Sequence, residues 1–248
     1  MSGHSHWATI KHKKAAVDAK KGRAFSKVAK LIMSTARAGA DPAFNIRLRQ
    51  AIEKAQSNNM PREKIENAIK KGSGQLEGFS LVEVSYEGYS PGGIAILVDA
   101  LTDNRNRTTP EIRHIFEKRG GTMGGPNSVA RKFKPRGLFL LSGVTIEEDK
   151  LLELLLEAGM EDYSAMGTGE YEVYTSPEGC GAMKAFLEKE KFTFKGQIAK
   201  VAIAPIPVDL DTYRKVIAIM EELEEHDDTQ EVYADFDVSP EVLAAAGD

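Results

Sequence analysis

The first fourteen residues of the chain carry the residue types that contact nucleic acid. Three lysines, Lys11, Lys13 and Lys14, can neutralise phosphates, and Trp7, the chain's only tryptophan, can stack on a base. No acidic residue interrupts this segment, and it is too poor in apolar residues to build a core, so we expect a flexible arm. A solvated tail without a function is the alternative. We favour nucleic-acid contact because the basic character continues into the following segment.

The charge of the chain is divided unevenly along its length. The 248 residues carry a net charge of -4, but residues 1–78 have a balance of +10 and the remainder has a balance of -14. This asymmetry indicates a basic module that faces nucleic acid, attached to an acidic body that does not coat polyanions indiscriminately.

The basic module is expected to be a small bundle of three amphipathic helices. Residues 23–39 have apolar side chains at helical spacing, with a cationic ridge in an arc of about 80° on the opposite side. A second helix is expected to begin at Asp41-Pro42, and a third to begin at Pro61 and end at Gly72. The candidate nucleic-acid contacts of this region are Trp7, Lys11, His12, Lys13, Lys14, Lys20, Lys21, Arg23, Lys27, Lys30, Arg37, Arg47 and Arg49.

A second candidate site joins an apolar strand to a helix at residues 102–113. Thr108 and Glu111 have the spacing of a capping box, and Pro110 suits the first turn, so we expect a helix over 110–119.

The candidate contacts of this second site are Arg105, Arg107 and Arg113. Arg105 and Arg107 would lie beside the positive end of that helix, where an anion is favoured. Alternatively, these arginines pair with Asp99, Asp103 or Glu111 and hold the loop together.

After residue 78 the pattern changes to alternating strands and helices. Two strands and a helix are expected over 81–119, followed by the order βαββαβ over 129–204, which is the ferredoxin-like arrangement. A helix over 210–225 and a strand over 231–236 can pack against other elements only if they join the two strands and the helix expected over 81–119. The prediction is therefore a multidomain α+β protein with domains 1–78, 79–129 plus 205–248, and an inserted domain 130–204.

The sequence argues against several other classes of protein. One cysteine, Cys180, excludes an internal disulfide framework, and no apolar run approaches the length of a membrane span. No secretory signal, nucleophile elbow, zincin helix or kinase signature is present, so we expect a cytoplasmic protein that is not an enzyme and has no cofactor or metal. The acidic run 221–228 at the end of a predicted helix is expected to be solvated surface.

Two long motifs resemble those of a known family. The opening MSGHSHWATIKHKKAAVDAKKGRAFSK and the segment TDNRNRT, followed by EIRH and a Gly-Gly pair, are similar to the signatures of the YebC/PmpR family. That family includes the mitochondrial translational activator of cytochrome c oxidase. The segment 124–129 departs from the family's usual acidic-Gly-Ser-Val form. The resemblance implies a helical N-terminal domain and two α+β domains, the third inserted in the second, and a non-enzymatic role.

These observations lead to a nucleic-acid-binding regulator of gene expression. The resemblance implies a DNA-binding transcriptional regulator, with a ribosome-associated translation factor that contacts rRNA or tRNA and eases synthesis through proline stretches as the alternative. An enzyme that uses the cleft between the α+β domains is a further alternative. We expect nucleic acid as the partner, with the ribosome as a second candidate, no membrane, and a monomer.

Overall fold

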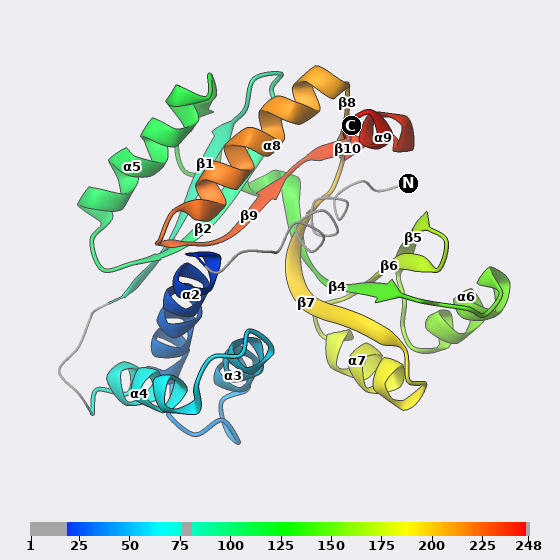
Figure 1. Ribbon diagram of the computed structural model, residues 1–248, viewed down its shortest axis with the longest axis horizontal. Coiled ribbons are helices and arrows are strands. Elements are labelled where there is room, and N and C mark those ends of the chain that lie inside the picture. The colour runs from blue at the N-terminus through cyan, green and yellow to red at the C-terminus, as the bar shows by residue number, and fades with distance from the viewer. Residues whose placement is uncertain (1–18, 76–80, 247–248) are drawn as a thin grey trace. The chain divides into compact units, whose positions relative to one another are not determined.

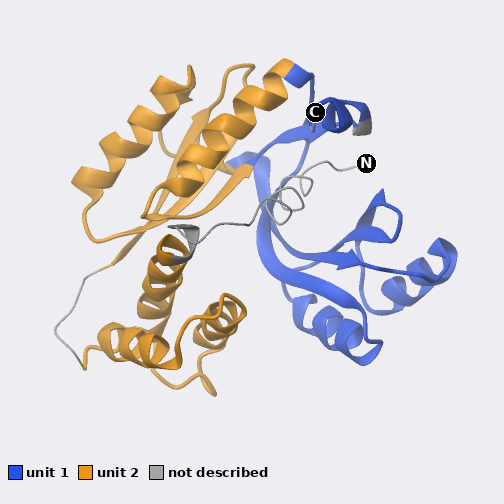
Figure 2. Ribbon diagram, viewed as in Figure 1, with its two compact units in different colours: residues 1–14, 131–210, 234–248 blue, residues 15–130, 211–233 orange. Residues whose placement is uncertain are grey.

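The computed structural model describes residues 19–75 and 81–246 (Figure 1). These residues form two compact units, coloured separately in Figure 2. Among the described residues, unit 1 holds 131–210 and 234–246, and unit 2 holds 19–75, 81–130 and 211–233. The predicted α+β fold class is confirmed by this mixture of helices and antiparallel sheets. The residue boundaries of the three predicted domains stay a prediction.

Three helices at the start of unit 2 enclose an apolar core. They are α2 (Ala19–Ala36), α3 (Ile46–Ser57) and α4 (Arg62–Gly72), and buried side chains such as Ile32 and Leu48 fill the space among them. Gly72 allows α4 to approach α2 closely, because a Cβ atom there would lie 2.3 Å from the Met33 carbonyl oxygen. The sequence pattern predicted these helices because each carries one apolar face.

The second helix starts later than predicted. Asp41-Pro42 was expected to open it, but residues 41–44 form a turn, and α3 begins at Ile46 with Asn45 as its cap. The Asn45 side chain accepts a hydrogen bond from the Leu48 amide at 3.0 Å, which satisfies one of the free donors of the first turn. An asparagine next to the apolar face is therefore a better cap than the aspartate four residues before it.

The sheet of unit 2 collects strands from two distant parts of the chain. Its order is β3 (Thr122–Met123), β1 (Val82–Tyr89), β2 (Ala95–Thr102) and β9 (Thr229–Ala234). Strands β1 and β2 form an antiparallel hairpin, and α5 (Arg105–Lys118) packs against β1 and β3. Helix α8 (Leu210–Glu225) precedes β9, so a segment near the end of the chain adds a strand to the sheet formed by β1, β2 and β3.

A buried carboxylate holds the glycine-rich segment that follows β3. Glu87 on β1 accepts hydrogen bonds from the amides of Asn127, Val129 and Ala130 at 2.6–2.8 Å. No motif in the sequence points to Glu87. Its side chain satisfies three backbone donors at once, which fixes the path of the chain over residues 127–130.

The sheet of unit 1 has the ferredoxin-like arrangement predicted from the order of its elements. The elements are β4 (Phe133–Ser142), α6 (Glu148–Glu157), β5 (Asp162–Gly167), β6 (Glu170–Thr175), α7 (Cys180–Lys189) and β7 (Thr193–Ala202), and the sheet order is β5-β6-β4-β7. All neighbouring strands are antiparallel. The core lies between this sheet and its two helices, around Phe139, Leu151 and Met183. This confirms the βαββαβ prediction.

Short elements complete unit 1. A 3-10 turn, η2 (Ala130–Lys132), leads into β4, and the strands β8 (Ile206–Val208) and β10 (Phe236–Val238) form a parallel pair before α9 (Pro240–Ala246). Lys132 pairs at 2.6 Å with the buried carboxylate of Asp235. None of the helices in the described ranges is long and apolar enough to cross a membrane.

Candidate nucleic-acid interface

Most of the predicted cationic ridge on α2 contacts the protein itself. The ammonium group of Lys27 donates to the carbonyl of Glu224, and that of Lys30 donates to the carbonyl of Asp227 at 3.1 Å. Arg37 donates to the carbonyl of Leu81 at 2.8 Å. The last carbonyls of a helix lack partners within it, so lysines placed there stabilise the end of α8.

The acidic run at the end of α8 is not simply solvated surface, so that expectation is wrong. The Asp228 side chain is only 1% exposed. It accepts hydrogen bonds from Lys30 at 2.5 Å, Arg107 at 2.8 Å and the Thr108 hydroxyl at 2.6 Å. The carbonyl of the same residue accepts from the Leu101 amide at 2.8 Å, which ties it to β2.

Electrostatics keep Asp228 ionised in spite of its burial. Burial alone would raise the pKa of this carboxyl, but hydrogen bonds from Lys30, Thr108 and Arg107 outweigh it and hold the pKa well below its usual range. The same contact, first through the hydrogen bond and then through the charge of Asp228, raises the pKa of Arg107. Asp228 therefore links α2, α5 and the start of β9 within unit 2.

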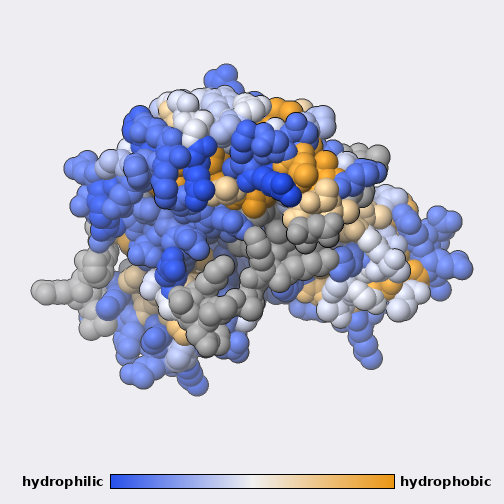
Figure 3. Space-filling model, turned by 45° about the horizontal axis from the view of Figure 1, so that its top comes forward, coloured by the Kyte–Doolittle hydropathy of each residue, from blue (hydrophilic) through white to orange (hydrophobic). Residues whose placement is uncertain are grey.

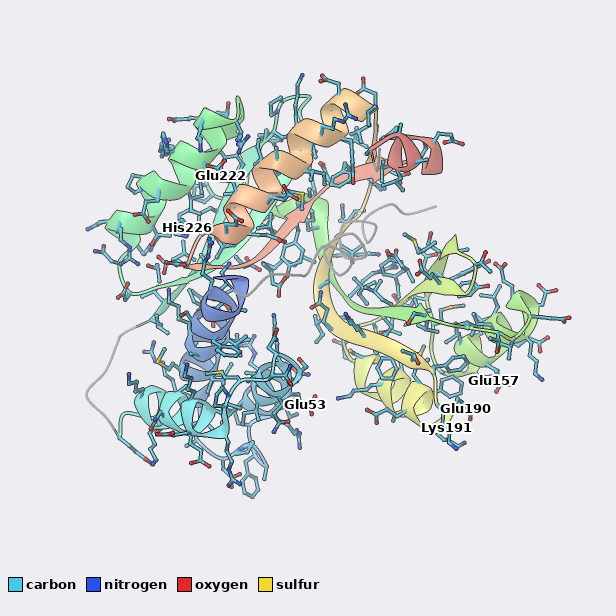
Figure 4. All side chains as sticks on the ribbon, in the orientation of Figure 1. Glu53, Glu157, Glu190, Lys191, Glu222 and His226 are labelled. Atoms are coloured by element: carbon cyan, nitrogen blue, oxygen red, sulfur yellow. The ribbon has the colours of Figure 1, made fainter. Side chains whose placement is uncertain are left out.

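One more acidic residue of the run, Glu222, is paired with the end of α5. Glu222 contacts Lys118 and Arg119 at 2.6 Å each, and hydrogen bonds from these two residues lower its pKa. His226 lies 3.0 Å from Glu111, and its Nδ1 atom accepts from the Asp228 amide. Figure 4 labels Glu222 near the end of α8 and His226 just after it, on the side of α8 that lies beside α5. These pairs offset the unfavourable position of acidic residues at a helix C-terminus.

The predicted start of the helix at the arginine-rich segment is wrong. Helix α5 begins at Arg105, and the Asn104 side chain caps it by accepting from the amides of Asn106 and Arg107 at 3.1 and 3.2 Å. Thr108 is not part of a capping box, because it is fully buried and donates to Asp228. Pro110 therefore lies inside the helix, where it has no N–H for the carbonyl four residues earlier.

The structure separates the three arginines of this segment. Arg107 pairs with Asp228 and also, at 3.1 and 3.9 Å, with Asp103 and Glu111. Two of the three carboxylates named in the pairing alternative are therefore partners of Arg107. Arg105 and Arg113 are exposed and make no hydrogen bond or ion pair with any described residue. Figure 3 shows mostly hydrophilic residues on the part of the surface formed by α5.

Three further arginines that the sequence predicts as nucleic-acid contacts are also exposed and unpaired. Within the part of the chain that the structure describes, Arg23 on α2 and Arg47 and Arg49 on α3 have no hydrogen-bonding or ionic partner. The remaining predicted contacts lie outside the described residues, or have side chains outside them; these are Trp7, Lys11, His12, Lys13, Lys14, Lys20 and Lys21. The predicted contacts that are unpaired thus come from α2, α3 and α5, all in unit 2; Arg131, in η2 of unit 1, is also exposed and has no partner among the described residues.

Phe44 is a further surface residue that the sequence analysis did not single out. Its side chain is 91% exposed on the loop between α2 and α3. The feature of the sequence that could have indicated an exposed Phe44 is a single aromatic residue in a turn that follows Asp41-Pro42. No group of three His, Cys, Asp or Glu side chains that could hold a metal ion occurs within the described ranges.

Comparisons with known proteins agree over nearly the whole chain. Residues 5–75 match the model of the TACO1/YebC protein N-terminal domain, and residues 81–236 match that of the TACO1/YebC second and third domain. A protein of Natranaerobius thermophilus named "probable transcriptional regulatory protein" is 45% identical, and the match covers 98% of this chain and 99% of that one. A protein of Aquifex aeolicus with the same name is 47% identical over the full length of both.

A solved structure is similar to the whole fold. The crystal structure of a conserved hypothetical protein from Aquifex aeolicus matches with a TM-score of 0.84 and 47% sequence identity. The match covers 96% of this chain and 99% of that one.

Proposed function

The chain belongs to the TACO1/YebC family, and from that premise we propose that it is a non-catalytic, nucleic-acid-binding regulator of gene expression that acts on DNA in transcription. The names of the relatives support regulation of transcription. We further propose that it acts in the cytoplasm as a monomer.

The observation that carries this proposal is the set of exposed, unpaired arginines on unit 2. Arginine binds phosphate through two parallel hydrogen bonds, and a side chain without an internal partner loses no existing contact on binding. Each of the helices α2, α3 and α5 carries at least one exposed arginine with no partner among the described residues. These arginines are Arg23, Arg47, Arg49, Arg105 and Arg113. Residues 1–78 add a balance of +10, which would attract a polyanion over a distance.

A second candidate, a translation factor that contacts rRNA or tRNA, is favoured by the surface of α4. Helices α3 and α4 are joined by a short connection, as the helices of a helix-turn-helix are, but α4 is a poor reader of a major groove. Its exposed side chains include Glu63 and Glu66, and Arg62 is paired with Glu66 at 2.7 Å. Although α4 has four basic and two acidic residues, both carboxylates lie in its first half, the end that a recognition helix directs at the bases, where they would face the duplex phosphates.

The test compares two pairs of charge removals in the full-length protein. The variant Arg105→Gln with Arg113→Gln removes two unpaired cations of α5. The matched control, Lys150→Gln with Lys189→Gln, removes two exposed cations from the helices of unit 1. Binding is measured over a range of salt concentrations with a duplex DNA, a tRNA and ribosomes as ligands.

We expect the arginine variant to bind duplex DNA more weakly, with the log–log salt slope smaller by about 2 units, and the control to keep the wild-type slope. Thermal stability should not change, since the arginines have no internal partner. Equal slopes in both variants would remove α5 from the interface. Tighter wild-type binding to tRNA or ribosomes than to duplex DNA at physiological salt would favour the translation factor.

A further inference from the structure

The turn between α2 and α3 (Figure 1) carries an aromatic residue whose side chain is exposed to solvent. Phe44 is 91% exposed, and Ile46, at the first position of α3, is 63% exposed. Leu48, two residues further on, is completely buried, so the chain does place an apolar side chain of this segment in the core. Burying a phenylalanine contributes about 1.5–3 kcal/mol, and Phe44 contributes none of this to the fold.

The turn that carries Phe44 is firmly held. The Asp41 carbonyl accepts from the Phe44 and Asn45 amides at 3.2 and 3.0 Å. The Asn45 side chain donates to the carbonyls of Thr35 and Gly39 at 2.8 and 2.7 Å, which fastens the turn to the end of α2. These bonds leave the backbone little freedom to turn Phe44 inward. The ring is therefore presented to solvent by a fixed support, so a partner that binds it pays little ordering entropy.

The two arginines nearest this ring along the chain have no partner among the described residues. Arg47 and Arg49 are exposed and have no partner among the described residues, and Arg49 lies on the same helical face as Ile46, three positions away. The first turn of α3 has no acidic residue. Asp41 accepts the Ala43 amide at 2.8 Å, and Glu53 lies two turns further along the face. An exposed ring beside two free guanidinium groups suits a partner with a flat apolar face and flanking anions.

A nucleotide chain has this chemistry, and a protein partner fits less well. Among the described residues of α2, α3, α4 and their loops, Phe44 and Ile46 are the only large apolar side chains that are strongly exposed. A specific protein interface buries about 800 Å² on each partner, with a hydrophobic centre. Two side chains are too few for that centre, but one ring is enough to stack on one base.

We propose that Phe44 stacks on an unpaired nucleobase while Arg47 and Arg49 bind the adjacent phosphates. This deepens the nucleic-acid function proposed above and rests on it. In an uninterrupted duplex both faces of every base are already stacked, so the Phe44 surface selects single-stranded or looped segments.

The test uses the full-length protein with three labelled probes of one mixed sequence: single-stranded RNA, single-stranded DNA and duplex DNA. The variants are Phe44→Ala, Phe44→Trp, and Arg47→Gln with Arg49→Gln. Leu156→Ala is the matched control, because Leu156 is an apolar side chain 61% exposed on α6 of unit 1. Thermal unfolding checks that each variant is folded.

We expect Phe44→Ala to weaken single-strand binding by about 5- to 160-fold, with little effect on the duplex and an unchanged salt slope. Phe44→Trp should bind as wild type, and the double arginine variant should lower the single-strand slope by about 1.4 units. The Leu156→Ala control should match wild type. The single-stranded probe, RNA or DNA, whose binding is weakened more by Phe44→Ala is the polymer that this surface binds.

Three results would overturn the inference. Single-strand binding by Phe44→Ala equal to wild type would remove the ring from the contact and leave the proposed function intact. An equal loss on single strands and on the duplex would exclude stacking on an unpaired base. A wild-type dimer that becomes a monomer in Phe44→Ala, measured by sedimentation, would make the surface a contact between copies. If wild type binds none of the probes, the proposed function itself fails.

Discussion

Replacing Asp228 by asparagine should destabilise unit 2, because this carboxylate is the shared acceptor of three elements. The substitution keeps the shape of the side chain and removes its charge. One of its two oxygens becomes an NH₂ group, which cannot accept from Lys30, Arg107 or Thr108. The side chain is 1% exposed, so water does not replace the lost acceptor.

The size of the effect follows from the three hydrogen bonds, at 2.5, 2.6 and 2.8 Å. A hydrogen bond to a charged group contributes about 1.5–3 kcal/mol net, and a neutral one about 0.5–1.5 kcal/mol. Lys30 and Arg107 are 22% and 46% exposed and can be rehydrated, which reduces the loss. We expect Asp228→Asn to lower the free energy of unfolding by about 2–3 kcal/mol at pH 7, or the melting temperature by about 4–12 °C.

The pH dependence gives a second measure of the same carboxylate. Its pKa is lowered in the folded protein, whereas in the unfolded chain it titrates near pH 3.9. Its contribution is therefore complete above about pH 4 and is lost as the pH falls further, since the unfolded chain then takes up a proton that the folded protein does not. The gap between wild type and Asp228→Asn should narrow below that pH.

Urea unfolding followed by circular dichroism, between pH 7 and pH 3, measures this gap. Asp227→Asn is the matched control: its side chain is exposed and makes no hydrogen bond or ion pair with a described residue, so its unfolding free energy should stay within about 0.5 kcal/mol of wild type. An Asp228→Asn protein as stable as this control would refute the reasoning, as would a gap that widens on acidification.

The remaining predictions concern the N-terminal arm and the packing of α4. Replacing the three arm lysines by glutamine should lower the log–log salt slope of nucleic-acid binding by about 2–3 units, and an unchanged slope would exclude the arm; the residues are Lys11, Lys13 and Lys14. Gly72→Ala should cost about 1–3 kcal/mol in thermal unfolding, since the new Cβ would meet the Met33 carbonyl. Gly22→Ala on α2, with open space around it, should instead gain about 0.5–1 kcal/mol, and equal stabilities of the two variants would contradict this account.

Predictions based on local pattern agree with the structure. The ferredoxin-like order over 130–204 and the end of α4 at Gly72 follow from the spacing of apolar residues, which depends on neighbours a few positions away. The first helix was expected over 23–39 and instead spans Ala19–Ala36. The starts of α3 and α5 were wrong, because several capping residues stand close together and tertiary contacts choose among them. Thr108 is drawn into the core by Asp228, a residue 120 positions away, and this leaves Asn104 to cap α5.

The amino-acid sequence by itself determined the order of the elements, the division of charge and the membership of the family, because these depend on composition and near-neighbour spacing. Only the tertiary structure decided which charges are available to a partner. Arg105 and Arg107 are two residues apart and chemically identical, yet Arg107 meets a buried carboxylate and Arg105 meets solvent. Hydrogen bonds and ion pairs act over a few ångströms, and the fold alone brings α2, α5 and the start of β9 within that distance.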